Sequence, residues 1–146
     1  MTARYLLDTN VLSELMRPQP DAAVLAWMER QTPAGLYTSA ITMAEIEAGL
    51  ALMPSGQRQR ALQAAAATMF EQDFAGRLWT FDAAAAQGYA QVKAQRHRAG
   101  RPIGHADAQI AALALIHEAT LVTRNLTDFA GIEGLGVLNP WASSCA

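Results

Sequence analysis

The sequence has almost no cysteine: Cys145, next to the end, is the only one among 146 residues. A single thiol cannot form an internal disulfide, which is consistent with a chain that folds in a reducing cytoplasm. Long apolar runs are also missing. The run IAALALI (110–116) is far shorter than the roughly 20 residues of a membrane span, and the first residues lack the pattern of a signal peptide. We therefore expect a soluble, cytoplasmic protein with no membrane partner.

Charged residues are scarce as well. They make up 16% of the chain against 51% hydrophobic residues, a balance typical of a folded globular protein. The net charge of −2 gives no support for non-specific binding to nucleic acid. This length fits one domain with its own core, and we predict a single domain over residues 1–141 with a short tail at 142–146. The closing PWASSCA (140–146) predicts a loose end.

The chain does contain a regular alternation of short apolar runs and helical segments. Five runs predict strands, at about residues 4–7, 35–39, 77–81, 120–123 and 136–139. Six segments predict helices, at about residues 9–16, 21–30, 41–53, 57–72, 82–99 and 105–119. Such alternation predicts an α/β fold in which helices cover both faces of a parallel sheet of four to five strands.

Two of the predicted strands end in polar residues. YLLDTN (5–10) places Asp8 at the carboxyl end of the first strand, and TLVTRN (120–125) ends in Asn125, with Asp128 close behind. Ligands of open α/β sheets bind outside the carboxyl ends of strands, so the two ends can share one site. The alternative for Asp8 is that it only caps the helix that follows.

Two further acids lie on helices. Asp107 lies three residues before Ile110, which places it on the apolar stripe of its helix. An unpaired carboxylate is costly there. The alternative is that an acid in the first turn only favours the helix dipole. Thr42-x-x-Glu45 fits a capping box, and periodicity does not decide whether Glu45 or Glu47 faces inward.

Inward carboxylates repel one another unless something neutralises them, and these apolar segments contain no Lys or Arg. A divalent cation would neutralise them. Oxygen ligands favour Mg²⁺ or Mn²⁺, and no spacing of Cys and His predicts zinc. Magnesium held by carboxylates and substrate phosphates is the chemistry of phosphoryl transfer or phosphodiester hydrolysis.

Four stretches in order resemble motifs of the PIN-domain ribonucleases, in particular the VapC-type toxins of bacterial toxin–antitoxin pairs and their FitB-like subgroup. They are LLDTNVLSEL, SAITMAEIEAGL, GHADAQIAALA and TLVTRNLTDF, and the match runs from Tyr5 to the NPW at 139–141. The resemblance implies a PIN-like three-layer α/β/α fold. It also implies a Mg²⁺-dependent endoribonuclease, with Mn²⁺ as a substitute, that hydrolyses single-stranded RNA to leave a 5′-phosphate and a 3′-hydroxyl. Its implied partners are a second copy of the chain and a small antitoxin protein that holds the toxin inactive.

Carried over onto this chain, the resemblance implies an acidic catalytic cluster. Asp8 and Asp107 would be the main ligands of the metal ion, with Glu45 beside them. Glu45 is preferred to Glu47 because Gly49 follows it at the spacing of the family.

The chain departs from the family pattern at one position. Asn125 stands where many family members have an acid, and Asp128 would compensate from the next turn as a catalytic residue. The polar residues that would assist in binding substrate are Thr9, Asn10, Ser39 and Asn125.

The dense basic run KAQRHRAGR (93–101) would supply phosphate contacts, in particular from Arg98 and Arg101. The alternative is a solvated helix end, where cations suit the helix dipole. The helices at 41–53 and 57–72 could supply surfaces for the partners or could belong to the core.

Two other functions fit part of the pattern. An aspartyl phosphatase would use Asp8 as its nucleophile, but such enzymes usually have a second Asp where this chain has Asn10. A non-catalytic PIN-like module that binds RNA or protein is the other alternative, and Asn125 favours it. Failure to bind Mn²⁺ would support this second alternative.

Overall fold

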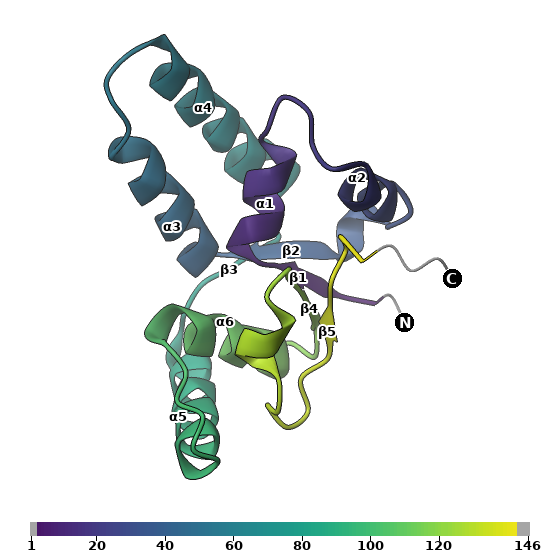
Figure 1. Ribbon diagram of the computed structural model, residues 1–146, viewed down its shortest axis with the longest axis vertical. Helices are drawn as coiled ribbons and strands as arrows, with labels where there is room; N and C mark the ends of the chain where they lie inside the picture. Colours follow the sequence, from purple (N-terminus) through teal and green to yellow (C-terminus); the bar gives the residue numbers. More distant parts are fainter. Residues whose placement is uncertain (1–2, 143–146) are drawn as a thin grey trace.

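The computed structural model describes residues 3–142, which form three layers with a parallel sheet between two layers of helices (Figure 1). The strands are β1 (Tyr5–Leu7), β2 (Leu36–Ser39), β3 (Leu78–Trp79), β4 (Thr120–Val122) and β5 (Val137–Leu138). They are ordered β3-β2-β1-β4-β5, and every neighbouring pair is parallel. The predicted α/β fold with a short parallel sheet is therefore confirmed.

The helices lie close to their predicted positions. They are α1 (Thr9–Leu15), α2 (Ala22–Glu29), α3 (Ala40–Ala51), α4 (Gln57–Thr68), α5 (Ala83–Arg98) and α6 (His105–Ile116). Three short turns add to them: the 3₁₀ turns η1 (Pro33–Gly35) and η3 (Leu126–Phe129), and the π-helical turn η2 (Met69–Asp73). The structure differs from the prediction at η2, where α4 changes its hydrogen bonding, and at β3, which is shorter than 77–81.

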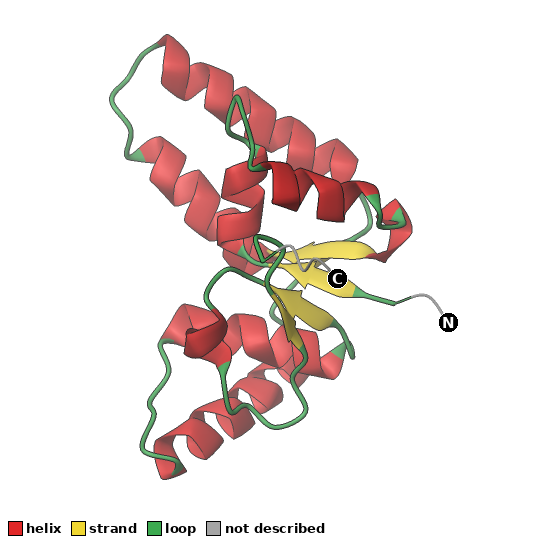
Figure 2. Ribbon diagram, turned by 45° about the vertical axis from the view of Figure 1, so that its right-hand side comes forward, coloured by secondary structure: helices red, strands yellow, loops and turns green. Residues whose placement is uncertain are grey.

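Each face of the sheet has its own core. Leu6 packs in the cluster formed with α5 and α6, whereas its neighbour Leu7 packs in the cluster formed with α1 to α4. Successive residues of a strand point to opposite faces, so a strand buried on both faces is an unbroken apolar run. Figure 2 shows the sheet between the two groups of helices.

Two pairs of helices extend from the sheet in opposite directions (Figure 1). In one pair, α3 buries Ile46 and Leu50, while Leu52 beyond its end is 85% exposed. Helices α3 and α4, which the sequence left open as partner surface or core, therefore contribute to both. In the other pair, α5 packs tightly on α6 at Gly88, where an added Cβ would lie 3.3 Å from the Cβ of Ala112.

The chain remains packed beyond β5. Pro140 is buried, and Trp141 packs against the core of α1 to α4, with the guanidinium of Arg124 lying 4.8 Å from its ring centroid. The loose end expected from residue 140 is wrong for these two residues. Residues 143–146, and Cys145 with them, lie outside the described part. Between residues 3 and 142, no helix combines the length and the apolar character needed to span a membrane.

Candidate active site at the carboxyl edge of the sheet

Asp8 is both a helix cap and a site residue. It follows β1 directly, is buried, and its Oδ1 accepts a hydrogen bond of 2.8 Å from the main-chain N–H of Thr9 in α1. Its Oδ2 accepts a hydrogen bond of 2.8 Å from the hydroxyl of Thr123. A plain cap does not account for this second contact, which joins Asp8 to the residue that follows β4.

Thr123 connects the two strand ends that the sequence predicted to share a site. Besides donating to Asp8, its hydroxyl accepts from the side-chain amide of Asn10 at 3.2 Å and from the main-chain N–H of Asn125 at 3.1 Å. Asn10 in turn accepts from the main-chain N–H of Arg124 at 3.2 Å. The sequence analysis did not identify Thr123 as a site residue, although its position at the end of an apolar strand could have indicated it.

Glu45 reaches the same edge from α3. The hydroxyl of Thr9 donates a hydrogen bond to its carboxylate and lies 3.2 Å from the hydroxyl of Thr42. The predicted capping box is wrong, because the cap of α3 is Ser39, whose hydroxyl accepts from the main-chain N–H of Thr42. The helix begins directly after β2, so Glu45 has no capping role, and the buried Ser39 supports α3 from inside.

Glu45 and Asp128 lie close enough to Asp8 and Asp107 for their charges to raise the pKa of both. Burial, and after it the charges of Asp8, Asp128 and Glu45 in that order, together raise the pKa of Asp107 to about 6. Burial also raises the pKa of Asp8, the hydrogen bond from Thr123 lowers it, and Glu45 and Asp128 again contribute repulsion. The structure thus brings together the acids predicted from four separate segments.

Asp128 and Asn125 lie on the exposed side of this edge. Asn125 precedes η3 and makes no side-chain cap there, whereas Asp128 lies within η3. The charge of Asp128 reaches both Asp8 and Asp107. A carboxylate three residues further on thus adds negative charge to the edge where position 125 has only an amide.

The donor set at this edge fits magnesium, although its geometry is open. In the part of the chain from residue 3 to 142, no three His, Cys, Asp or Glu side chains form a ready-made metal cage. Magnesium commonly binds to one or two carboxylates and keeps several waters, so a closed cage is not required. Oxygen ligands that repel one another are the donors that a hard divalent cation would stabilise.

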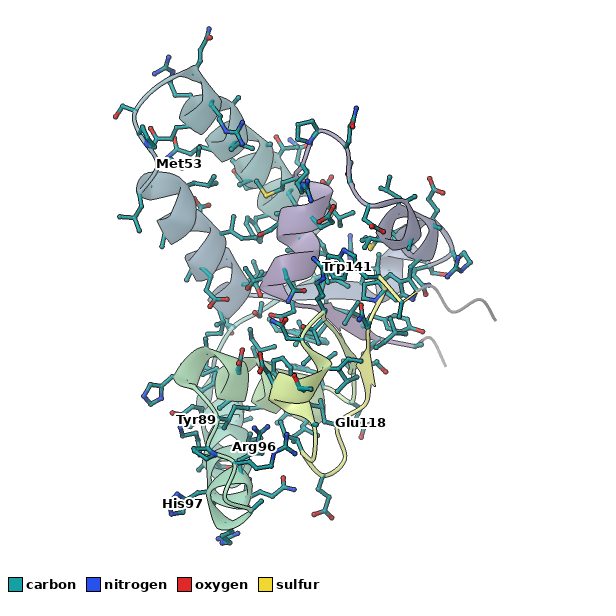
Figure 3. All side chains as sticks on the ribbon, in the orientation of Figure 1. Met53, Tyr89, Arg96, His97, Glu118 and Trp141 are labelled. Carbon is teal, nitrogen blue, oxygen red and sulfur yellow. The ribbon has the colours of Figure 1, made fainter. Side chains whose placement is uncertain are left out.

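The predicted basic run is only partly a surface feature. Arg96 is 5% exposed and donates hydrogen bonds to main-chain carbonyls, and Lys93 donates to the carbonyl of Ile103 at 2.6 Å. Arg98 is exposed in the last turn of α5, near His97, which Figure 3 shows at the end of that helix away from the sheet. Arg101 lies nearer, with its guanidinium 3.4 Å from the carbonyl of Thr127.

Arg96 brings a cation to the acids from outside their own apolar segments, which contain no Lys or Arg. It belongs to the basic run, and its charge lowers the pKa of Asp107. Its position four residues after the buried Val92 was the signal that it lies on the inward stripe of α5.

A groove adjoins the acids between α1, α3 and α4. Thr9 and Glu45 line it next to the acidic edge, and its walls are mostly apolar. Its other lining residues include Met16, Ile46 and Leu62, and the cations Arg17 and Arg58. The site therefore continues into a surface that combines apolar and basic side chains.

The fold and the acidic edge together define the class of this protein. Residues 5–134 match the family model of the PIN domain, and the chain belongs to that family. It is 44% identical over 136 residues to the VapC ribonuclease Y4jK of Sinorhizobium fredii, with 93% of this chain and 96% of the relative covered. It is 40% identical to the toxin FitB of Neisseria gonorrhoeae, with coverages of 93% and 97%.

A solved structure supports the same relationship. The crystal structure of FitAcB from Neisseria gonorrhoeae superposes with a TM-score of 0.84 at 38% identity, covering 94% of this chain and 98% of the other. The resemblance inferred from the four sequence motifs is therefore confirmed at the level of fold and family.

Proposed function

We propose that this protein is a metal-dependent endoribonuclease that hydrolyses single-stranded RNA and acts as the toxin of a toxin–antitoxin pair. The observation that carries the proposal is the meeting of Asp8, Glu45, Asp107 and Asp128 at one edge of a PIN-family sheet. Relatives that cover nearly the whole chain are named a ribonuclease and a toxin, which supports the same activity.

Asp8, Asp107 and Glu45 would hold Mg²⁺, or Mn²⁺ in its place. The bound ion supplies charge stabilisation for phosphate oxygens and a more acidic water. Asp8 is fixed by Thr123 and by the start of α1, so its carboxylate is pre-oriented. Glu45 is exposed and orients the attacking water or assists in binding the ion. Attack by this water in line with the 3′ oxygen would form a bond from its oxygen to phosphorus and break the bond from phosphorus to the 3′ oxygen. The water loses a proton and the departing 3′ oxygen takes one up, which leaves a 5′-phosphate and a 3′-hydroxyl.

The surrounding polar groups would position the RNA. Thr9 and Asn10 lie beside the two fixed strand ends, and Asn125 and Arg101 lie beside η3. Arg98 is further away and would contact the chain of phosphates rather than the reacting one. Such contacts orient a nucleic acid without reading its sequence.

The groove between α1, α3 and α4 would receive the antitoxin. Its apolar walls suit an amphipathic segment, and its basic residues Arg17 and Arg58 suit acidic side chains. A segment bound there would lie against Glu45 and exclude RNA. The exposed Leu52 at the end of α3 is a candidate contact in a homodimer.

The alternative functions have less support. An aspartyl phosphatase would need a second carboxylate near Asp8, and the side chain of Asn10 is instead bonded to Thr123 and to the main chain of Arg124. A non-catalytic module is favoured only by Asn125 at the fourth acidic position. It predicts that the purified protein does not bind Mn²⁺.

The test is cleavage of labelled single-stranded RNA by the purified, antitoxin-free protein with Mg²⁺, Mn²⁺ or EDTA. We expect cutting that needs the metal and that falls by roughly 100-fold or more in Asp107→Asn and Glu45→Gln, because each substitution removes a carboxylate that would hold the ion or orient the attacking water. Glu47→Gln is the matched control, two residues along the same helix, and should cut as the wild type does.

Each other outcome has a distinct meaning. Cutting that survives both EDTA and Asp107→Asn would overturn the mechanism. A protein that neither cuts RNA nor binds Mn²⁺ would be the non-catalytic module. A protein that binds Mn²⁺ but does not cut has a different substrate.

A further inference from the structure

Arg96 is a buried charge outside the acidic cluster. It lies near the end of α5 and is 5% exposed, and burial of a guanidinium is costly unless its donors are satisfied. Within residues 3–142 it forms no ion pair at 4.0 Å or less. A cation buried at this cost without an ion pair points to a role that an apolar residue could not fill.

The donors of Arg96 go to the main chain of two loops. Its Nε donates to the carbonyl of Arg101 at 2.7 Å, and its Nη1 donates to the carbonyl of Asp128 at 2.8 Å. A longer contact of 3.5 Å reaches the carbonyl of Ala130. Figure 3 shows Arg96 pointing from α5 toward the segment that contains η3. One guanidinium therefore ties the connection between α5 and α6 to the turn that contains Asp128.

The other contacts of that turn leave the carbonyl of Asp128 to Arg96: the main-chain N–H of Asp128 donates to the carbonyl of Asn125, and Arg101 donates to the carbonyl of Thr127. This segment is a single 3₁₀ turn, and Asn125 before it provides no side-chain cap. Phe129 is buried and anchors its far end, and Gln95 of α5 holds the chain further on, through the carbonyl of Gly131 and the main-chain N–H of Glu133. The contact of Arg96 with the carbonyl of Asp128 thus holds the main chain of the residue whose charge reaches Asp8 and Asp107.

We propose that Arg96 is a positioning residue of the acidic edge, which fixes the main chain at Asp128 so that this carboxylate stays beside Asp8 and Asp107. The inference rests on the proposed function for the purpose of the site. It explains how a chain with Asn125 at the fourth acidic position keeps four carboxylates together.

The direction in which the Mn²⁺ affinity changes on substitution of Arg96 separates this positioning role from a purely electrostatic one. Removal of a positive charge near carboxylates by itself strengthens their attraction for a cation. Loss of positioning instead moves Asp128 away and weakens binding. Arg96→Met keeps the apolar stem of the side chain and removes both the charge and the donors, so Mn²⁺ affinity changes in opposite directions under the two explanations.

The experiment measures Mn²⁺ binding by electron paramagnetic resonance and hydrogen exchange of residues 125–130 in the metal-free protein. For Arg96→Met we expect roughly tenfold weaker Mn²⁺ binding, the usual cost of losing a group that supports the ligands from outside, and faster exchange of the amides of Asp128 and Ala130. Arg96→Lys keeps the charge and one donor and should recover part of both. Gln95→Met, the matched control, should leave Mn²⁺ binding at the wild-type level.

Two further variants test whether Arg96 acts through Asp128. Asp128→Asn should weaken Mn²⁺ binding, and adding Arg96→Met to it should weaken binding no further, since the positioned carboxylate is already gone. Equal or tighter Mn²⁺ binding by Arg96→Met, or a tenfold loss that persists in the double variant, would overturn the proposal. If Arg96→Met does not fold, Arg96→Lys decides: unchanged exchange and binding would overturn it equally. Failure of the wild type to cut RNA would contradict the proposed function and leave both of these readouts intact.

Discussion

The pKa of Asp107 has a direct consequence for stability. Burial, followed by repulsion from Asp8, raises it from 3.8 to about 6. Between these two values the folded protein binds more protons than the unfolded chain, so the free energy of unfolding falls as the pH rises. The penalty is complete above about pH 6 and absent below the pKa of the unfolded state.

Asp107→Asn should therefore stabilise the metal-free protein at neutral pH. We expect a gain of roughly 1–2 kcal/mol at about pH 7.5, after allowance for solvent around a half-buried group, and almost none near pH 4. The measurement is urea unfolding in EDTA at both pH values. Equal dependence on pH in the variant and the wild type would show that Asp107 is not the residue responsible.

Single residues also show where the sequence is informative. Asp8 and Asp107 could be identified because a carboxylate at a strand end or on an apolar stripe conflicts with its surroundings. The cap of α3 was misassigned because Ser39 and Thr42 are both good caps, and only the end of β2 decides between them. Arg96 was taken as part of an exposed run because its charge suggests solvent and says nothing of the carbonyls it meets.

Two glycines within helices provide a test at the scale of the element. A Cβ added at Gly49 of α3 meets nothing within 4 Å, whereas one at Gly88 of α5 lies 3.2 Å from Ile116 and 3.3 Å from Ala112. Gly49→Ala should raise the free energy of unfolding by roughly 0.5–1 kcal/mol, the usual gain in helix propensity.

Gly88→Ala gains the same propensity but forces α5 and α6 apart, at a cost of about 1–3 kcal/mol. It should be less stable than Gly49→Ala by at least roughly 1 kcal/mol in chemical denaturation. If both variants were equally stable, α5 and α6 would not pack as closely at Gly88 as the structure shows.

The helices were predictable because their caps and breakers are local signals, as with Asp21 before α2 and Asp82 before α5. The π-helical turn after α4 was not. The main-chain N–H of Phe74 bonds to the carbonyl of Met69, five residues back, and both side chains are buried. That switch follows from packing against the sheet, which no local pattern encodes.

At the scale of the whole molecule, metal binding should be coupled to folding. The acids come from segments that lie together only in the folded chain, so Mn²⁺ should bind the native state and not the unfolded one. At about 100 times its dissociation constant the ion should then stabilise the protein by roughly 2.7 kcal/mol.

Thermal unfolding with Mn²⁺ and with EDTA checks this coupling. We expect a higher midpoint with the ion, a smaller rise in Asp107→Asn and a full rise in the control Glu47→Gln. Identical unfolding curves with the ion and with EDTA would mean that the acidic edge does not bind it.

The class of fold followed from the alternation of strands and helices, but the order of strands did not. β1 lies between β2 and β4, so the first strand of the chain pairs with one that lies more than a hundred residues later. Nothing local in YLLDTN or TLVTRN specifies this neighbour. The pairing depends on which faces of the helices can be buried together.

The pairing of β1 with β4 also sets an order of events during synthesis. A ribosome makes Asp8 first, yet the hydroxyl that holds it belongs to Thr123, and Asp128 follows later still. A growing or prematurely ended chain without β4 has Asp8, Glu45 and Asp107 but lacks both Thr123 and Asp128. The complete site can therefore form only after the segment from β4 to η3 has been synthesised, more than a hundred residues after Asp8.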